Sequence, residues 1–201
     1  DFLKPKSPLE KAAKDLREPY AQPDVRQAAM DKLFELGTEE AYDELLNRFT
    51  FNANGQIADE SEKKSLVDRL ASSGEDATPA IERFIKNQKS ITFPIQALRK
   101  IRGDEGARTF IVETLSELEP QDHRSIQAKV VLVGVMAEIG SADDAELLVR
   151  YLEDHSDDVQ FQAIEALEHL QAESAAPALV DVCCSDLHAP RIQRRAARAL
   201  A

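Results

Sequence analysis

The chain has no tryptophan, few other aromatic residues and only two cysteines among its 201 residues. The cysteines, Cys183 and Cys184, are adjacent, and neighbours on a helix point too far apart to bridge each other easily. A disulfide framework is therefore excluded, which favours a reducing, cytoplasmic compartment. The longest apolar run, 130–137, is far shorter than the roughly 20 residues that span a bilayer, so we expect no membrane segment.

The chain also lacks the common signatures of enzyme sites. It has no glycine-rich phosphate loop, no Gly-x-Ser-x-Gly turn and no Cys-x-x-Cys or His-x-x-x-His spacing. The one cluster of metal-ligand residue types, 154–158, is interpreted as a loop that caps the following helix, and paired carboxylates such as Asp143-Asp144 are interpreted in the same way. We expect no catalytic, cofactor-binding or metal-binding residues and no enzymatic activity.

Basic residues are scarce in one part of the chain. The net charge is −12, and residues 104–173 contain 17 acidic but only four basic side chains. Two interpretations stay open: this stretch is a solvated acidic surface that keeps the protein soluble, or it is a face for a partner with a basic surface.

A helical motif repeats about every 33 residues. Its first copy, Asp24–Gly37, has apolar residues at helical spacing and ends in Leu-Gly. Related stretches end at Gly74, Gly103 and Gly140. Periods in this range indicate helix pairs stacked into a solenoid. We predict an all-α fold of about six antiparallel helix pairs in one domain, 1–201, with repeats at approximately 7–37, 38–74, 75–103, 104–140, 141–171 and 172–201.

Local signals place the ends of the predicted helices. Ser7-Pro8-Leu9-Glu10 forms a capping box, and Gly37 supplies a left-handed residue after the second helix. The stretch 130–133 is predicted to be helical despite its β-branched residues. The predicted helices cover about 8–18, 24–36, 38–49, 61–74, 77–87, 92–102, 105–118, 123–139, 142–153, 158–170, 174–185 and 191–201.

The predicted connection 51–60 is longer than the others and contains the turn dipeptide Asn54-Gly55. Its two large apolar residues, Phe51 and Ile57, either fold back over the step between repeats or, in the case of Phe51, contact a partner. At the other end of the chain Leu200 lies inside a predicted helix, so we expect that the chain continues or that Leu200 meets another chain.

The motif resembles the HEAT repeat, and is closest to the short bacterial variety known as the phycobilisome-lyase HEAT-like repeat. The resemblance rests on Asp24–Gly37, and it returns at Asp158–Leu170 and Ile192–Leu200. It implies a right-handed superhelix in which the second helix of each pair lines the concave face.

The family also implies a ladder between repeats, formed by an Asp at the start of the second helix and an Arg two residues later. Only Asp24 and Arg26 match this pattern fully, because the last two repeats have Gln160 and Gln193 at the Arg position. A continuous ladder is therefore not predicted.

Small residues are expected to let the helices approach closely, namely Ala28, Ala29, Ala163, Ala196 and Ala197. Equivalent interior positions are assigned to Leu33, Leu98, Met136, Leu167 and Leu200.

These patterns predict a non-enzymatic scaffold that binds a protein through its concave groove or acidic face. The predicted contact residues are the exposed residues of the second helices together with the loop phenylalanine: Gln27, Asp31, Phe51, Lys64, Asp68, Glu138, Glu165 and Glu168.

Two other functions are compatible with the sequence. Some HEAT-like proteins bind DNA through a basic concave face, and a few of them are DNA glycosylases. Here Arg194 and Arg198 are the best candidates for such a face. A second basic cluster lies in the third repeat, but acidic residues interrupt the basic stripe, so nucleic acid is not the expected partner. The second alternative, a chromophore lyase, follows only from the phycobilisome-lyase resemblance and has no local constellation of residues behind it.

Overall fold

A computed structural model describes residues 7–201, in which all regular secondary structure is helical. The predicted all-α class is thus confirmed. The chain divides into two compact units, one ending at Gly103 and the other spanning Asp104–Ala201, and each is considered separately. The single domain and the right-handed superhelix remain predictions, and residues 1–6 of the predicted domain lie outside the described part.

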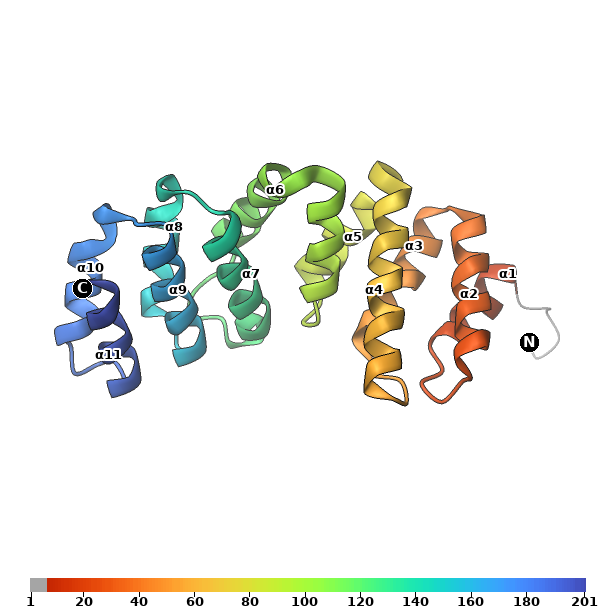
Figure 1. The fold of residues 1–201 in the computed structure, drawn as a ribbon, viewed down its shortest axis with the longest axis horizontal. Coiled ribbons are helices and arrows are strands. Elements are labelled where there is room, and N and C mark those ends of the chain that lie inside the picture. The colour runs from red at the N-terminus through yellow and green to blue at the C-terminus, as the bar shows by residue number, and fades with distance from the viewer. Residues whose placement is uncertain (1–6) are drawn as a thin grey trace. The chain divides into compact units, whose positions relative to one another are not determined.

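The first unit contains three predicted helix pairs (Figure 1). The first helix begins with the predicted capping box, in which the Ser7 hydroxyl accepts from the Glu10 N–H at 3.1 Å and the Ser7 N–H donates to the Glu10 carboxylate at 2.8 Å. Gly37 ends the second helix with a φ of 60°, as predicted. The helices are α1 (Pro8–Leu16), α2 (Pro23–Leu36), α3 (Glu39–Leu46), α4 (Gln56–Ser73) and α5 (Thr78–Asn87), followed by the first part of α6 (Thr92–Glu117).

Gly103 interrupts α6 where the two units meet in sequence. Its φ of 70° and ψ of 177° are not helical, and the positive φ is readily available only to glycine. The parts of α6 on either side correspond to the separately predicted helices 92–102 and 105–118.

The second unit continues with α7 (Ile126–Ile139), α8 (Ala145–Val149), α9 (Asp157–His169), α10 (Ala176–Cys184) and α11 (Pro190–Ala199). Residues 130–133 lie within α7, which confirms that this β-branched stretch is helical. α7 packs against α9, and α9 packs against α11. α10 and α11 lie side by side and run in opposite directions (Figure 1).

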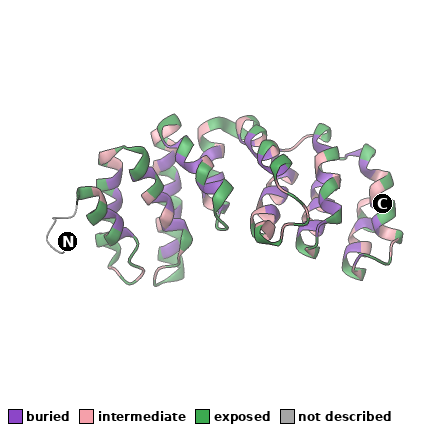
Figure 2. Ribbon diagram, turned by 180° about the vertical axis from the view of Figure 1, so that it is seen from behind, coloured by how far each residue is buried: buried purple, intermediate pink, exposed green. Residues whose placement is uncertain are grey.

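The core follows the helical spacing of apolar residues, and buried positions alternate with exposed ones along each helix (Figure 2). Leu33, Leu98, Met136 and Leu167 are buried, as predicted. The prediction for Leu200 is wrong, because its side chain is 39% exposed. Leu200 is the residue that directly follows α11, which ends at Ala199.

The alanines that were predicted to pack closely are also partly buried and partly exposed. Ala29, Ala163 and Ala196 are buried, but Ala28 and Ala197 are exposed. Ala28 directly precedes the buried Ala29, and Ala197 directly follows the buried Ala196, so each points away from the buried side of its helix. The residue type alone therefore does not tell which of these alanines is buried.

The long connection is shorter than predicted, because α4 begins at Gln56. Ile57 therefore lies in the first turn of a helix, where it is 88% exposed and does not fold back over the repeats. Phe51 is half-buried, and the Arg48 guanidinium carbon lies 4.7 Å from the centre of its ring. Among the helices of residues 7–201, none is both long enough and apolar enough to cross a membrane.

Candidate protein-binding surface

The second helices share a position seven residues before an equivalent Leu or Met, and it is polar in five of the six repeats. This Leu or Met is buried in every repeat except the last, where Leu200 is exposed. In five repeats the side chain at this position donates a hydrogen bond into the loop that precedes its helix. We call these five residues the turn-anchoring row: Arg26, Lys63, Lys129, Gln160 and Gln193. In the third repeat the equivalent residue is the buried Ile91.

The turn-anchoring row satisfies polar groups of the loops. Four of its members donate to main-chain carbonyls, for example Arg26 to the Ala21 oxygen at 2.6 Å and Gln160 to the Asp154 oxygen at 2.6 Å. Lys63 instead donates to the Asn52 side-chain oxygen at 2.7 Å. Because buried carbonyls without a donor are costly, these contacts hold the start of each second helix in place.

Sequence reasoning missed this role for Gln160 and Gln193, which looked like departures from an Asp–Arg ladder. An amide can donate to a carbonyl as an arginine does, so the loop contact survives the change of residue type. The spacing of seven residues to Leu167 and Leu200 was the signal that could have identified them.

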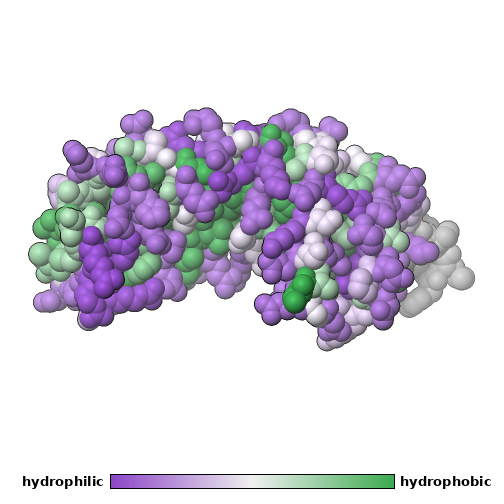
Figure 3. Space-filling view, in the orientation of Figure 1, coloured by the Kyte–Doolittle hydropathy of each residue, from purple (hydrophilic) through white to green (hydrophobic). Residues whose placement is uncertain are grey.

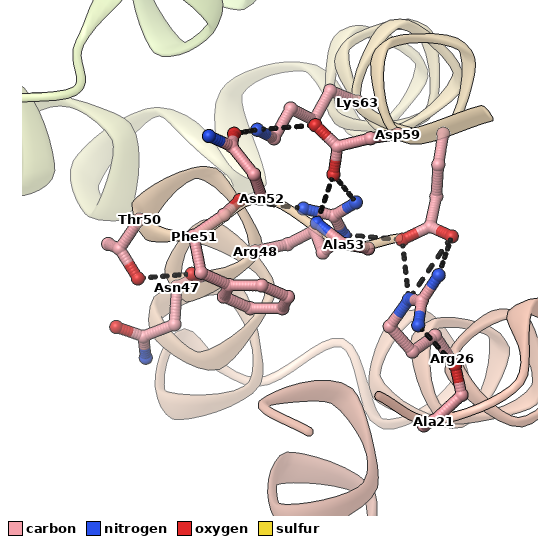
Figure 4. A network of polar contacts seen from close by, with 11 residues as sticks. Ala21, Arg26, Asn47, Arg48, Thr50, Phe51, Asn52, Ala53, Asp59 and Lys63 are labelled. Atoms are coloured by element: carbon pink, nitrogen blue, oxygen red, sulfur yellow. Dashed lines mark hydrogen bonds and ion pairs between the residues drawn. The ribbon is translucent and has the colours of Figure 1, made fainter. Parts of the chain in front are cut away.

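In the first unit, Arg26 belongs to a buried network of charges (Figure 4). Its guanidinium pairs with the Glu62 carboxylate at 3.0 Å, and Glu62 in turn pairs with Arg48. Arg48 is fully buried; it also pairs with Asp59 and donates to the Phe51 carbonyl at 3.2 Å. The carboxylate partner of Arg26 is thus a glutamate of the next repeat, while Asp24 is exposed.

The network lowers the pKa values of its two carboxylates, Asp59 and Glu62. Burial by itself raises the pKa of Asp59, but hydrogen bonds from Lys63, the Ala53 N–H and Arg48 outweigh it and lower the pKa from 3.8 to about 2. The pKa of Glu62 is lowered in the same way, because hydrogen bonds and charge from Arg26 and Arg48 overcome its burial. Both groups are therefore charged in the folded protein at neutral pH.

The predicted contact residues of α2 are exposed, and both form polar contacts with neighbouring side chains. Gln27 donates to the Asp31 carboxylate at 2.9 Å. Asp31 also pairs with Arg69 of α4 at 2.8 Å, and the Arg69 guanidinium carbon lies 4.2 Å from the centre of the Phe34 ring. The Asp31–Arg69 pair therefore links two second helices at the surface.

The predicted contact residues of α4 are exposed as well. Asp68 pairs with Lys100 in the 92–102 helix, which extends the surface links to a third second helix. Lys64 pairs with Glu60 of its own helix at 2.7 Å. Phe51 is not part of this exposed layer, because it lies beside the buried Arg48.

In the second unit, the predicted contact residues lie on α7 and α9. Glu138 is exposed near the end of α7, whereas Glu165 and Glu168 of α9 are half-buried. Gln162 donates to the Glu165 carboxylate at 3.4 Å. Glu168 forms an ion pair with Arg195 of α11, so here too a surface ion pair joins successive second helices.

Four arginines form a stripe along one face of α11, the most hydrophilic part of the visible surface near the C-terminus in Figure 3. Arg191 pairs with Asp158 of α9 at 3.2 Å, in addition to the Arg195–Glu168 pair. The guanidinium carbons of Arg191 and Arg195 lie 4.9 and 5.5 Å from the centre of the Phe161 ring. The stripe borders a hollow of about 430 Å³ lined by Phe161, Glu168, Arg191, Arg194, Arg195 and Arg198.

In the other basic cluster, which lies in the third repeat, three cations form ion pairs with acidic residues of other helices. Arg83 pairs with Glu39 and, at 2.9 Å, with Asp43. Arg102 pairs with Glu82, and Lys100 with Asp68 as described above. These cations are used in ion pairs between helices of the first unit.

The remaining candidate groups have structural partners. Asp144 accepts from the Ser141 N–H and from Arg108, both at 2.8 Å, which agrees with its interpretation as a cap. His123 and His155, far apart in sequence, stack with their ring centres 4.5 Å apart. Within residues 7–201 no group of three or more His, Cys, Asp or Glu residues could hold a metal ion.

Comparison with known families identifies part of the chain. Residues 115–201 match the family described as HEAT repeats, which confirms the resemblance to the HEAT repeat for this stretch. α7 to α11 and the end of α6 are thus HEAT repeats, while for the earlier helices the resemblance remains a prediction. No curated protein matches the chain.

Proposed function

We propose that the protein is a non-enzymatic scaffold that binds another protein along the exposed sides of its second helices. HEAT repeats stack helix pairs and so offer extended surfaces that are formed before a partner arrives. The match over residues 115–201 and the surface layer on α2, α4, α7, α9 and α11 support this function.

The observation that carries the proposal is that the second helices are held in two ways, by hydrogen bonds to the loops and by ion pairs at the surface. Beneath the surface the turn-anchoring row fixes the start of five of these helices. At the surface, ion pairs such as Asp31–Arg69 and Glu168–Arg195 join one second helix to the next. Side chains that are already held in place lose less conformational entropy when a partner binds. The entropic cost of binding to this surface is therefore lower.

The charge of the second unit indicates the kind of partner for α7 and α9. Residues 104–173 carry a large excess of acidic side chains, and Glu138 and Glu165 lie on the second helices of this stretch. A partner with a basic surface is attracted to them over a distance of about one Debye length. Its association should therefore slow as the salt concentration rises.

Site-specific photo-crosslinking tests the proposal. A crosslinking amino acid is placed at Gln27, Lys64, Glu138 or Glu165 on the second helices, or at the exposed control positions Lys14, Glu113 or Glu146 on first helices. In source-cell lysate, we expect the second-helix positions to capture one protein in stoichiometric amounts and the control positions to capture none. Capture of nucleic acid alone, or equal capture from both sets, would refute the proposal.

A further inference from the structure

We propose that the arginine stripe of α11 binds an acidic segment of a partner protein, with Arg194 and Arg198 each contacting one carboxylate. This inference rests on the proposed scaffold function and adds the chemistry of a segment that the scaffold recognises. The stripe consists of Arg191, Arg194, Arg195 and Arg198.

The four arginines fall into two pairs with different surroundings. Arg191 and Arg195 are held from below, since each pairs with a carboxylate of α9 and lies over the Phe161 ring. Arg194 and Arg198 are exposed, and neither makes an ion pair or hydrogen bond with any residue from 7 to 201. The stripe therefore carries two cations that α9 neutralises and two that nothing in the described chain neutralises.

The position of Arg194 is not explained by the stability of the helix. Like charges four residues apart repel each other, and Arg194 and Arg198 are such a pair. The helix dipole favours Arg198, which lies in the last turn, but Arg194 is the fifth residue of α11 and gains little from it. A ligand that supplies negative charge would relieve the repulsion between the two.

The geometry fits two carboxylates about one helical turn apart. Side chains at positions i and i+4 of a helix have Cβ atoms about 5–6 Å apart. Arg194 and Arg198 have this spacing, and so do two glutamates at positions i and i+4 of a partner helix. Guanidinium groups bind carboxylates with two parallel hydrogen bonds. The hollow next to them is lined by charged side chains and by Phe161, the one apolar residue that the methylene stem of such a glutamate could contact.

An acidic protein segment fits this stripe better than nucleic acid does. Binding of a nucleic acid needs several cations along the phosphate backbone, and only two unpaired arginines are present here. The same unit holds 17 acidic residues between positions 104 and 173, which repel a long polyanion. A short acidic segment can bind through the two arginines alone. It extends little beyond them and therefore meets less of this repulsion.

The test uses fluorescence anisotropy with two synthetic peptides and the full 201-residue chain. Both probes are labelled, alanine-rich helical peptides of about 15 residues. One carries glutamates at i and i+4, and the other has glutamines at the same positions. We expect the glutamate peptide to bind, with an affinity that falls as salt rises, and the glutamine peptide to bind at least tenfold more weakly.

Two double variants of equal charge make the result specific. Arg194→Ala with Arg198→Ala should weaken binding of the glutamate peptide at least tenfold. Arg124→Ala with Arg150→Ala removes two exposed cations elsewhere in the same unit and should leave binding unchanged. Circular dichroism should show that both variants keep their helices, since all four side chains are exposed.

Three outcomes would overturn the inference: no binding of the glutamate peptide, equal weakening by both double variants, or tighter binding of a labelled DNA duplex that is lost in the Arg194/Arg198 variant. None of these outcomes changes the photo-crosslinking result on α2, α4, α7 and α9. If crosslinking captures a protein while the acidic peptide does not bind, the scaffold function stands and only the acidic segment is wrong.

Discussion

Lys129 and Asp154 form an ion pair in which neither side chain is exposed to solvent. Lys129 belongs to α7, and Asp154 lies in the loop before α9, so the pair connects two successive repeats. The Lys129 ammonium also donates to the carbonyls of Pro120 at 2.7 Å and Glu119 at 3.3 Å, and Asp154 accepts from the Ser156 N–H at 2.9 Å. The ammonium is thus held by two carbonyls and the carboxylate by one main-chain N–H in addition to the ion pair, and such partners are what a charge needs in order to remain buried.

Removing the cation of this pair should destabilise the second unit strongly. Lys129→Met leaves the Asp154 carboxylate buried without its partner, and we expect a loss of about 3–5 kcal/mol in the free energy of unfolding. The double variant Lys129→Met with Asp154→Leu removes both charges and should recover part of this loss. Urea unfolding followed by circular dichroism measures both. A single variant as stable as the parent protein would show that the pair contributes little.

The buried network of the first unit predicts a specific loss of stability in acid. Because the folded pKa of Asp59 is lowered from 3.8 to about 2, its contribution is complete above pH 3.8 and is lost as the pH falls toward about 2. This contribution is of the order of 2 kcal/mol. In Asp59→Asn the free energy of unfolding should therefore be lower at neutral pH but fall less steeply below pH 3.8. Parallel pH profiles of the two proteins, measured by urea unfolding, would contradict the assignment to Asp59.

Two glycines of the second unit should respond to alanine in opposite directions. A Cβ at Gly140 would lie 2.5 Å from the Met136 carbonyl oxygen and 3.2 Å from the Leu170 side chain, so the main chain has to move. Gly140→Ala should cost about 1–3 kcal/mol. At Gly134, inside α7, a Cβ would meet the end of the flexible Gln162 side chain at 2.6 Å.

Gly134→Ala should therefore stabilise the protein by about 0.5 kcal/mol, because the Gln162 amide can turn away and alanine is the better helix former. Thermal unfolding of the two variants beside the parent protein checks both signs. A lower melting temperature for Gly134→Ala would mean that Gln162 cannot move.

Two leucines at equivalent positions of the repeat, one within α9 and one directly after α11, should differ in their contributions to stability. Leu167 is 1% exposed, and Leu167→Ala should cost about 2–5 kcal/mol through lost burial and the cavity left behind. Leu167→Arg should cost more, because it buries an unpaired charge. Leu200 is 39% exposed, so Leu200→Ala serves as the matched control and should change stability by less than about 0.5 kcal/mol. Equal losses from the two alanine variants in urea unfolding would contradict the different burial of the two positions.

The candidate surface was predictable where it depends on the helical period. Gln27, Asp31, Lys64, Asp68 and Glu138 were placed on the exposed sides of second helices, and the structure shows them exposed. The period does not say what an exposed residue touches. The Asp31–Arg69 and Asp68–Lys100 pairs depend on how neighbouring helices are aligned along their lengths, and no spacing within one helix encodes that alignment.

The same limit applies to the buried charges. Arg48 and Lys129 look like surface residues in the sequence, because long charged side chains are rarely fully buried. Both are buried because carboxylates from elsewhere in the chain, Asp59 with Glu62 and Asp154, reach them. The distinction between the two pairs of arginines on α11 also arises from α9, which supplies Phe161 and two carboxylates.

By itself, the amino-acid sequence determined the helical class, the repeat period and the approximate ends of the helices, since these follow from local spacing, capping residues and glycines. It also determined that the charge is concentrated between residues 104 and 173. Only the tertiary structure decided which charges are buried, which are paired and which face solvent without a partner. These properties depend on side chains that different helices bring together, and the helical period of one segment carries no information about them.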